Sequence, residues 1–399
     1  MKILILQRFD LSSVSCARRV ICQAEELARR GHEVILADFV HPQRQSELPS
    51  VAKRQLKDVE FIHLPRRIID LPSNITTLKA ISPKPDIIHL WKSYPDASIP
   101  AIQLARHWGV PLHYDYDDWE TGIATELARS SWAGYIANRW DRLLPSMTDT
   151  MTAASKYLYD HAVKWGADPN RIWDAPVGAD LEQFYPREKD PDIVKQYDLV
   201  YPTLVYHGQL EVASYAEQAV EALSHLIHDY PNAALFVIGG GRKLDSIKKQ
   251  ARDLHVEDQV IFTDYIPGDE APRYLSTADL ALAPFESNAV TKAKSPLKIA
   301  EYLAMGIPIV ASDIGEAPVM IGAAGRCVPC GDTKAMALQA CEILRDQTMQ
   351  AAMRAEGRKR AETIYNWKCH TDQLEKAYQK ALELSGSLHT HDVSDSSQV

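Results

Sequence analysis

The sequence predicts an α/β fold with two doubly wound parallel sheets. Apolar runs typical of buried strands alternate with helical stretches through the first half of the chain, and the alternation then begins again. Between the two series, residues 189–203 (KDPDIVKQYDLVYPT) are charged and punctuated by prolines, as in a linker. Because strand–helix alternation builds parallel sheets covered on both faces, we expect two Rossmann-like domains that face each other across a cleft, with C-terminal helices able to cross back to the first domain.

In the first half, five apolar runs are predicted as strands. Serine-rich residues follow the first run, a helix ends at Gly31, and the stretch SIPAIQLARHWG supplies another helix. The runs are KILILQ (2–7), EVILADF (33–39), FIHL (61–64), DIIHLW (86–91) and PLHYDYD (111–117). Together they predict an N-terminal domain over residues 1–188.

The second half repeats this organisation without a close repeat of the sequence itself. Its predicted strands are TLVYHGQ (203–209), AALFVIGGG (233–241), QVIFTDYI (259–266), LALAPF (280–285) and PIVASDI (308–314). They predict a C-terminal domain over residues 204–368. A helix over 369–384 and a disordered tail over 385–399 are expected to follow.

The composition is that of a globular protein without general affinity for nucleic acid. The chain of 399 residues is 46% hydrophobic and 24% charged, and its formal net charge is −9. This negative net charge disfavours binding to a polyanion but is compatible with a local basic site. The first apolar run is too short for a signal peptide, and no window approaches the roughly eighteen apolar residues of a membrane span. We expect a cytoplasmic location, with peripheral membrane contact and the oligomeric state left open.

The segment KSPLKIAEYLAMGIPIVAS (294–312) predicts a helix that begins beside an anion. Ser295 is a favourable N-cap and Pro296 suits the first helical position, which places Lys298 at N3. The helix dipole disfavours a cation there by roughly 0.3–1 kcal/mol. Glu301 lies on the same helical face as Lys298. The pattern therefore indicates an anionic ligand at the start of this helix, and a surface helix with solvated charges is the alternative.

Five stretches of the chain carry a resemblance to a known family. They are APVGADLEQFYP (175–186), LFVIGGG (235–241), VIFTDYIPGDEAPRYLSTADLALAPF (260–285), SPLKIAEYLAMGIPIVASDIG (295–315) and GRCVPCGDTKAMALQACEILRD (325–346). In this order they resemble the motifs of family 4 retaining glycosyltransferases, whose fold is GT-B. The fourth resembles the variant SPLKxxEYmAxGxPVVAsdxgG of the donor-binding motif. The resemblance covers most of residues 149–380, and RRGHEV (29–34) extends it loosely into the first domain.

The resemblance implies an enzyme that moves a hexose-like sugar from a nucleoside diphosphate to an acceptor hydroxyl, with retention. The donor, linked to UDP or GDP, is a co-substrate, and neither a metal nor a further cofactor is implied. A glycan, a lipid-linked group or a small molecule fits as the acceptor. Two alternatives stay open: a catalytically silent GT-B scaffold of a glycosyltransferase complex, and a GT-B nucleotide-sugar epimerase.

The resemblance also implies which residues hold the donor. Glu301 corresponds to the glutamate that binds the ribose diol, and Lys298 with the backbone before it meets the diphosphate. Because charge develops on the departing diphosphate, Lys298 is also expected to act in catalysis. The expected donor-binding residues are Gly208, Gln209, Gly240, Arg242, Lys294, Ser295, Pro296, Leu297, Lys298 and Glu301.

The sequence departs from the family pattern at charged positions. Ala293 replaces the first glutamate of the paired-glutamate motif. Gln209 replaces the arginine that normally follows Gly208, and no lysine comes shortly after it. The remaining candidates for neutralising the leaving diphosphate are Lys292, Lys294, Lys298, Arg242 and helix N-termini.

Acidic residues at the end of the fifth predicted strand are expected on the acceptor side. PLHYDYDDWE places Asp117 where many relatives carry a histidine before Asp118. We therefore expect Asp117 and Asp118 to act in catalysis and Asp115 to orient acceptor hydroxyls, with a metal site and a solvated loop as alternatives. Ser12 and Ser13 stand where relatives carry paired glycines, and they are expected to donate hydrogen bonds on the same side.

Residues 132–144 predict an amphipathic helix in the first domain. Arginines at 129, 139 and 142 accompany its apolar residues. Packing into the core is the expected use of this apolar face, and contact with a membrane that carries a lipid-linked acceptor is the alternative. The apolar residues are Trp132, Tyr135, Ile136, Trp140, Leu143 and Leu144. His89, which ends a predicted strand, is likewise expected in the core.

Overall fold

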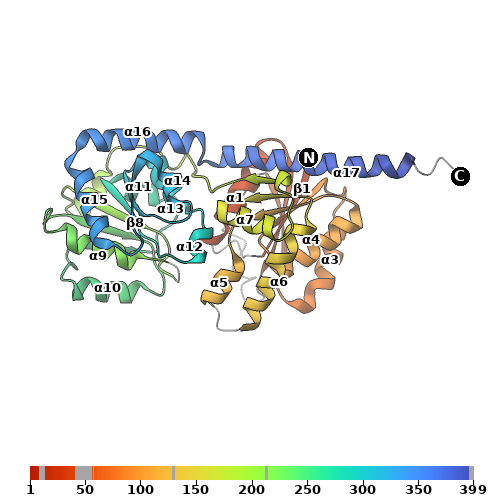
Figure 1. The fold of residues 1–399 in the computed structure, drawn as a ribbon, viewed down its shortest axis with the longest axis horizontal. Coiled ribbons are helices and arrows are strands. Elements are labelled where there is room, and N and C mark those ends of the chain that lie inside the picture. The colour runs from red at the N-terminus through yellow and green to blue at the C-terminus, as the bar shows by residue number, and fades with distance from the viewer. Residues whose placement is uncertain (9–13, 41–55, 57, 128–130, 212–213, 395–399) are drawn as a thin grey trace. The chain divides into compact units, whose positions relative to one another are not determined.

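The computed structural model describes residues 1–8, 14–40, 56, 58–127, 131–211 and 214–394, and the chain divides into two compact units. Unit 1 comprises Met1–Pro176 and Trp367–Val399, and unit 2 comprises Val177–Asn366. The C-terminal helix α17 (Trp367–Ser394) therefore belongs with the N-terminal residues, as predicted (Figure 1). Because α17 runs through Ser394, residues 385–394 are helical rather than part of the disordered tail that we expected.

Unit 1 is built on a seven-stranded sheet in the order β3-β2-β1-β4-β5-β6-β7. All neighbouring strands are parallel. The strand order reverses between β1 and β4, and open α/β sheets bind ligands at the carboxyl ends of strands at such a switch point. The strands are β1 (Lys2–Gln7), β2 (Glu33–Val40), β3 (Val59–Pro65), β4 (Ile87–Trp91), β5 (Leu112–Tyr116), β6 (Thr150–Ala153) and β7 (Ile172–Asp174).

Helices cover this sheet, and α17 completes the layer beside α1. Leu374, Tyr378 and Ala381 of α17 share one buried apolar cluster with residues of α1 and β1. Besides α17, the helices are α1 (Val14–Arg29), η2 (Ile68–Asp70), α3 (Leu71–Lys79), α4 (Pro95–Trp108), α5 (Glu120–Leu127), α6 (Ser131–Met147), α7 (Lys156–Lys164) and η3 (Pro169–Arg171). None of the helices in the described ranges combines the length and apolar character that a membrane span requires.

The α6 helix turns most of its predicted apolar residues outward. Leu144 is buried, but Trp132, Tyr135, Ile136 and Leu143 are exposed. The reason is that α6 packs against α5 and α7 through its other side. The expectation that the whole apolar face packs into the core was therefore wrong for those four residues.

Unit 2 is built on a six-stranded parallel sheet in the order β10-β9-β8-β11-β12-β13. Here the order reverses between β8 and β11, which makes the carboxyl end of β8 a second switch point. The strands are β8 (Thr203–His207), β9 (Ala234–Ile238), β10 (Val260–Asp264), β11 (Leu280–Ala283), β12 (Ile309–Ser312) and β13 (Gly325–Val328).

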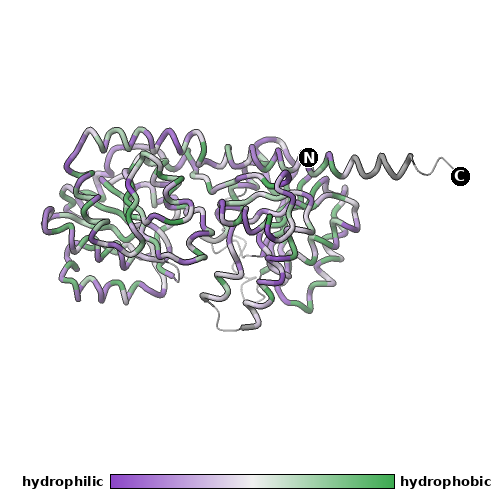
Figure 2. Tube along the Cα trace, viewed as in Figure 1, coloured by the Kyte–Doolittle hydropathy of each residue, from purple (hydrophilic) through white to green (hydrophobic). Residues whose placement is uncertain are grey.

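The helices of unit 2 alternate apolar and polar residues along their length, which appear as green and purple bands in Figure 2. Residues 189–203, expected as a linker, lie inside this unit, and Asp190 caps a short helix there. The helices are α8 (Pro191–Gln196), α9 (Ala216–Leu226), α10 (Leu244–Asp253), α11 (Ala271–Ser276), α12 (Ala289–Ala293), α13 (Leu297–Met305), α14 (Ala317–Ile321), η4 (Gly322–Ala324), α15 (Thr333–Arg345) and α16 (Gln347–Thr363). The two doubly wound sheets confirm the predicted fold class.

Candidate functional site

Glycines shape the backbone at the carboxyl end of β8. An added Cβ at Gly239 would lie 2.2 Å from the Gly208 carbonyl oxygen, and one at Gly241 would lie 2.5 Å from the Leu210 carbonyl oxygen. Gly208, Gly239 and Gly241 also have positive φ values, which other residues rarely adopt. The turns after β8 and β9 are therefore in direct backbone contact, and no side chain fits between them.

The start of α13 differs by one residue from the prediction. The helix begins at Leu297 with Pro296 as its N-cap, and Pro296 offers no side-chain hydrogen bond there. Ser295, expected as the cap, instead accepts a hydrogen bond from the Val177 amide at 3.1 Å. Lys298 still lies in the first turn, so its charge remains at the positive end of the helix dipole.

The Lys298 ammonium reaches back to the end of β8. Its Nζ lies 3.8 Å from the centroid of the Tyr206 ring, and an added Cβ at Gly208 would lie 3.3 Å from it. Burial acts to raise the pKa of Tyr206, but the Lys298 charge and the hydrogen bonds to the hydroxyl outweigh burial and lower this pKa. Within the described ranges, Lys298 joins no ion pair with a carboxylate. Such an ammonium is well suited to receive an anion.

Glu301 lies one turn further along α13 and faces the same strand end. Its buried carboxylate has Oε2 at 3.2 Å from Nδ1 of His207, the last residue of β8. The His207 amide donates to the Tyr302 hydroxyl at 2.7 Å, which joins β8 to α13. Lys298 and Glu301 thus bring a cation and a carboxylate to the switch point of unit 2. His207 was not among the predicted site residues, although its place directly before Gly208 was an available signal.

The other expected donor-binding residues follow β8 or β9 or lie just before α13. Arg242 is exposed, and its Nε pairs with Glu211 Oε2 at 2.6 Å. The Arg242 charge is therefore already matched by a carboxylate within the protein. Gln209 directly follows β8, Gly240 follows the neighbouring strand β9, and Lys294 lies between α12 and α13.

In unit 1, Asp115 belongs to a buried polar network. Its carboxylate accepts two hydrogen bonds from Arg19 (both 2.8 Å), one from Gln23 (2.8 Å) and one from Thr152 (2.7 Å). Burial acts to raise the pKa of Asp115, but the charge and hydrogen bonds of Arg19 outweigh burial and hold it well below its usual range. These four bonds use the acceptor capacity of the carboxylate. The expectation that Asp115 orients acceptor hydroxyls therefore does not agree with the structure.

His370 of α17 extends this network. Its Nδ1 lies 2.9 Å from the Pro176 carbonyl oxygen, which can only accept, so Nδ1 carries the proton and Nε2 accepts from the Gln23 amide at 2.8 Å. Burial is the main cause that lowers the pKa of His370 to about 3. His89 is a core residue, as expected: its Nδ1 lies 2.5 Å from the Tyr378 hydroxyl, and burial lowers its pKa to about 4.

Asp117 and Asp118 lie around a lysine that the sequence analysis did not identify. Lys92 directly follows β4 with a φ of 67°, and its side chain is buried. Its Nζ donates to Asp118 and to Glu120 Oε1 (2.8 Å), and it lies 3.7 Å from Asp117 Oδ2. The Tyr94 hydroxyl donates to the other oxygen of Glu120. An ammonium thus occupies the centre of a cluster for which a metal ion was one alternative.

Burial and neighbouring charges perturb the pKa values of this Lys92 cluster (Lys92, Asp117, Asp118 and Glu120). Burial raises the pKa of Asp117 to about 6, opposed by Arg19 and reinforced by Asp118. Burial also raises the pKa of Glu120. For Lys92, burial acts to lower the pKa, but the three carboxylates outweigh it. A carboxyl group that titrates near neutrality is suited to exchange a proton with a bound hydroxyl.

Ser12 and Ser13 lie outside the described residues. Just before them, Arg8 has its Nε 3.3 Å from Asp96 Oδ2 and its guanidinium 3.8 Å from the centroid of the Tyr94 ring. Tyr94 therefore links the end of β1 to the Lys92 cluster. In the parts of the chain that the structure describes, no group of three or more histidine, cysteine or acidic side chains is arranged to hold a metal ion.

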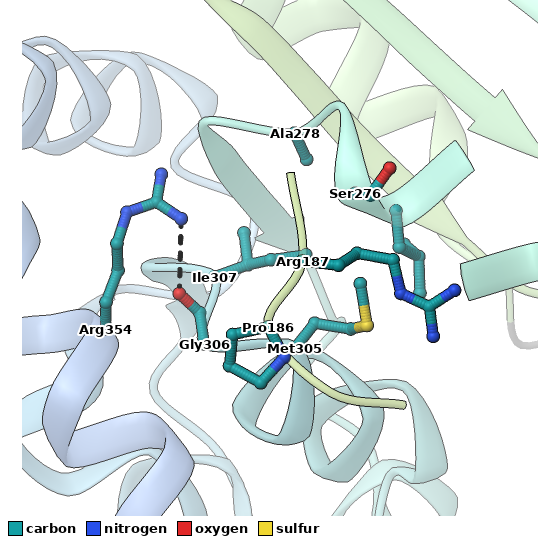
Figure 3. Close-up of a pocket in the computed structure, with 9 residues that line it drawn as sticks. Pro186, Arg187, Ser276, Ala278, Met305, Gly306, Ile307 and Arg354 are labelled. Atoms are coloured by element: carbon teal, nitrogen blue, oxygen red, sulfur yellow. Dashed lines mark hydrogen bonds between the residues drawn. The ribbon is translucent and has the colours of Figure 1, made fainter. Parts of the chain in front are cut away.

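A cavity of about 100 Å³ in unit 2 lies away from these residues (Figure 3). Ala278 and Ile307 line it just before β11 and β12, so it lies at the amino ends of those strands. Arg354 donates to the Gly306 carbonyl oxygen at 3.3 Å, and the Arg187 guanidinium lies on the other side of the view. The two arginines do not converge on one point, and the cavity is not part of the candidate site.

Comparison with known proteins gives two family matches that together span most of the chain. The family described as Glycosyltransferase Family 4 matches residues 17–183, and the family described as Glycosyl transferases group 1 matches residues 192–360. The first match covers most of unit 1 and extends into unit 2 over residues 177–183, and the second match lies within unit 2. The resemblance that the sequence motifs indicated is thereby confirmed.

Two individual relatives match this chain at 28% and 25% sequence identity. A GDP-mannose-dependent alpha-(1-6)-phosphatidylinositol monomannoside mannosyltransferase of Mycolicibacterium smegmatis is 28% identical over 242 residues, covering 58% of this chain and 63% of that protein. A D-inositol 3-phosphate glycosyltransferase of Rhodococcus opacus is 25% identical over 385 residues, covering 91% of this chain and 84% of that protein. The match spans 59–63% of the length of four curated mannosyltransferases, so about three fifths of each.

Solved structures show the same fold. The sucrose-phosphate synthase of Thermosynechococcus elongatus superposes with a TM-score of 0.74 at 19% identity, covering 96% of this chain and 99% of that chain. At this level of identity the likeness concerns the fold alone.

Proposed function

We propose that this chain, which belongs to the group 1 and family 4 glycosyltransferases, transfers a hexose-like sugar from a nucleoside diphosphate to an acceptor hydroxyl with retention. In this reaction the bond between the anomeric carbon and a diphosphate oxygen breaks. A bond from the acceptor oxygen to the same carbon forms, and the acceptor hydroxyl releases its proton to a base. The observation that carries the proposal is that Lys298 and Glu301 lie together on α13 at the switch point of unit 2.

The roles of these two residues follow from their chemistry. A carboxylate can accept hydrogen bonds from both hydroxyls of a ribose diol, which supports Glu301 as the ribose ligand. Lys298 would meet the diphosphate, where its charge stabilises the negative charge that grows as the sugar leaves. Ala293 cannot supply the second carboxylate of the family pattern, so contacts to the sugar must come from other groups.

Acceptor binding is proposed for unit 1, at the Lys92 cluster. Asp117 and Asp118 lie at the carboxyl end of β5, where an open sheet binds its ligands. Because the pKa of Asp117 is raised to about 6, this carboxyl group is suited to hold the proton of an acceptor hydroxyl. Lys92 acts as a positioning residue that keeps the neighbouring carboxylates in place.

The names of two relatives support a proposal for the class of the sugar donor and the class of the acceptor. The mannosyltransferase of Mycolicibacterium smegmatis is named for GDP-mannose and a phosphatidylinositol mannoside, and the relative from Rhodococcus opacus for inositol 3-phosphate. We propose a GDP- or UDP-linked hexose as the donor and a lipid-linked or small polyol as the acceptor. Both family matches favour a transferase over an epimerase.

Nucleotide binding is the first test, measured as the rise in melting temperature with UDP or GDP. A ligand that binds the folded state alone raises stability with its concentration. We expect one of the two nucleotides to do so, and we expect Glu301→Ala to lose most of the effect. Glu257→Ala, at an exposed site in unit 2, is the matched control and should keep it. No rise with either nucleotide, or a full rise in Glu301→Ala, would contradict the proposed donor site.

The loss of the first glutamate at Ala293 keeps one alternative open, a catalytically silent scaffold that binds nucleotide without turnover. Slow hydrolysis of GDP-mannose or UDP-glucose by the purified chain separates the two functions. An enzyme releases the nucleoside diphosphate and the free sugar, whereas a scaffold binds the nucleotide sugar and leaves it intact.

A further inference from the structure

The outer face of α6 exposes aromatic and aliphatic side chains to an unusual degree. Trp132 is 70% exposed, Tyr135 is 56% exposed, and Ile136 and Leu143 are each 40% exposed. Residues three and four apart share one side of a helix, so these four form a continuous stripe. In a folded protein, a contiguous apolar stripe of this kind marks an interaction surface rather than ordinary surface variation.

The same stripe is cationic. Arg139 and Arg142 are exposed and fall at the helical spacing of the stripe. The sole acidic residue in the sequence of α6 is Asp141. It is buried, where its carboxylate accepts hydrogen bonds from Ser93 and Thr121. The stripe therefore carries two positive charges and no negative one, on a chain whose formal net charge is −9.

A second exposed apolar group lies in the same unit. Ile68 is 84% exposed and Ile69 is 81% exposed, directly after Arg66 and Arg67. These residues follow β3, so they lie at the carboxyl end of the sheet. Arg67 pairs with Asp70 at 2.7 Å. The pair of isoleucines thus repeats the exposed apolar character of α6, but not its unmatched positive charge.

The start of α6 lies toward that same end of the sheet. α5 begins four residues after β5 ends, and α6 runs back toward the start of β6. With 17 residues, α6 is roughly 25 Å long. Figure 1 shows α5 and α6 side by side, projecting from the rest of unit 1. Trp132 and Tyr135 are therefore carried on the side of the sheet where the Lys92 cluster lies.

We propose that the α6 face, defined as Trp132, Tyr135, Ile136, Arg139, Arg142 and Leu143, binds unit 1 to the surface of a bilayer with anionic lipids. Tryptophan and tyrosine favour the membrane interface, where the ring meets the acyl boundary and the polar group stays hydrated. Arginines on the same face are attracted to anionic headgroups. The inference rests on the proposed function, because docking here would bring a lipid-linked acceptor to the carboxyl end of the unit 1 sheet.

The positive charge of the α6 face favours an anionic bilayer over a second copy of the chain as its binding partner. A self-associating face would bring Arg139 and Arg142 of each copy close to the same residues of the other, or require acidic partners. The α6 face itself supplies no such partner. An anionic lipid surface, by contrast, provides a negative charge and an apolar interior together.

The test is co-sedimentation of the full chain with phosphatidylcholine vesicles, with and without phosphatidylglycerol. We expect binding to the anionic vesicles that weakens with added salt. Arg139→Gln/Arg142→Gln should lower the affinity for anionic vesicles by roughly fivefold per arginine. Trp132→Ser/Tyr135→Ser should lower it by at least about tenfold, because both rings are lost from the interface. Tyr265→Ser, at an exposed site in unit 2, is the matched control and should bind as the unchanged chain does.

Three results would overturn the inference. The unchanged chain could fail to bind anionic vesicles, or the two α6 variants could bind as well as the control. Alternatively, the chain could form dimers in solution that Trp132→Ser/Tyr135→Ser dissolves, which would identify a second copy as the occupant. Each protein is also tested for the rise in melting temperature with UDP or GDP. If the unchanged chain fails to bind anionic vesicles but still binds nucleotide, this inference alone is overturned. If the unchanged chain does not bind nucleotide, the proposed function is overturned.

Discussion

Acidification is expected to destabilise unit 1 through His370, and replacing this residue should remove that part of the acid sensitivity. In the folded chain Nδ1 donates to the Pro176 carbonyl and Nε2 accepts from Gln23. Protonation would place a second N–H against the Gln23 amide, a donor facing a donor. The imidazole therefore stays neutral in the folded state, with its pKa lowered to about 3, mainly by burial.

The magnitude follows from the difference in protonation between the two states. In an unfolded chain a histidine has a pKa of about 6.5. Above this pH the residue is neutral in both states and costs nothing. Below this pH the histidine binds a proton in the unfolded chain but not in the folded chain. The free energy of unfolding therefore falls by about 1.4 kcal/mol per pH unit. Between about pH 6.5 and about pH 5 the loss is roughly 2 kcal/mol.

His370→Asn isolates this contribution. At about pH 7.5 the variant should be less stable by roughly 1–3 kcal/mol, because a buried hydrogen bond to Gln23 is lost. The deficit should shrink by about 1.4 kcal/mol per pH unit below about pH 6.5, since asparagine does not titrate. All eight tryptophans lie in unit 1, so urea unfolding followed by tryptophan fluorescence reports on this unit. His228→Asn, at an exposed site in unit 2, is the control. A deficit in His370→Asn that stays constant with pH would refute the reasoning.

Three further predictions concern the candidate site. Lys298→Gln should lower kcat by about 10²–10³, with little change in the melting temperature of the empty protein; Lys249→Gln, an exposed lysine of unit 2, is the control, and near-normal turnover would remove Lys298 from catalysis. Lys92→Met should lower the stability of unit 1 by about 3–5 kcal/mol, because its carboxylate partners stay buried without a cation; fluorescence-monitored unfolding beside Lys79→Met measures this, and a loss equal to the control would contradict the proposed positioning role. EDTA should leave sugar transfer unchanged, and a strict requirement for Mn²⁺ or Mg²⁺ would return the acidic cluster to the role of metal ligand.

The sheet architecture could be predicted because strands buried on both faces form continuous apolar runs. The runs that became β1, β2, β4, β5, β8, β9, β11 and β12 have this character. β3 and β10 are edge strands and only partly buried, but their apolar residues are also consecutive. β6 (Thr150–Ala153), β7 (Ile172–Asp174) and β13 (Gly325–Val328) were not predicted, because they have at most four residues and mixed composition. Strands this short are held by pairing with their neighbours, which local sequence does not reveal.

In the candidate site, too, local features could be predicted from the sequence and contacts between distant segments could not. That Lys298 and Glu301 lie on one face of a helix could be predicted, because they are three positions apart and local periodicity places them together; their roles stay a prediction. Asp115 could not be interpreted correctly, because Arg19, its main partner, is 96 residues away on α1. Lys92 was missed because the carboxylates that surround it follow another strand. The charge of a buried residue is decided by partners from distant segments, and a single sequence does not place those segments.

The distribution of cations around β8 explains why Lys298 should matter more here than the family pattern implies. Arg242 pairs with Glu211, and the neighbouring Lys243 pairs with Glu217 and donates to the Ser214 carbonyl. Both charges are therefore matched inside the protein, and the uncharged Gln209 contributes none. Lys298 contacts the ring and hydroxyl of Tyr206 instead. An aromatic ring and a hydroxyl hold an ammonium less strongly than a carboxylate does. In the proposed reaction, a diphosphate would therefore meet the Lys298 charge without first breaking an ion pair, and this charge would stabilise the negative charge that grows on the leaving group.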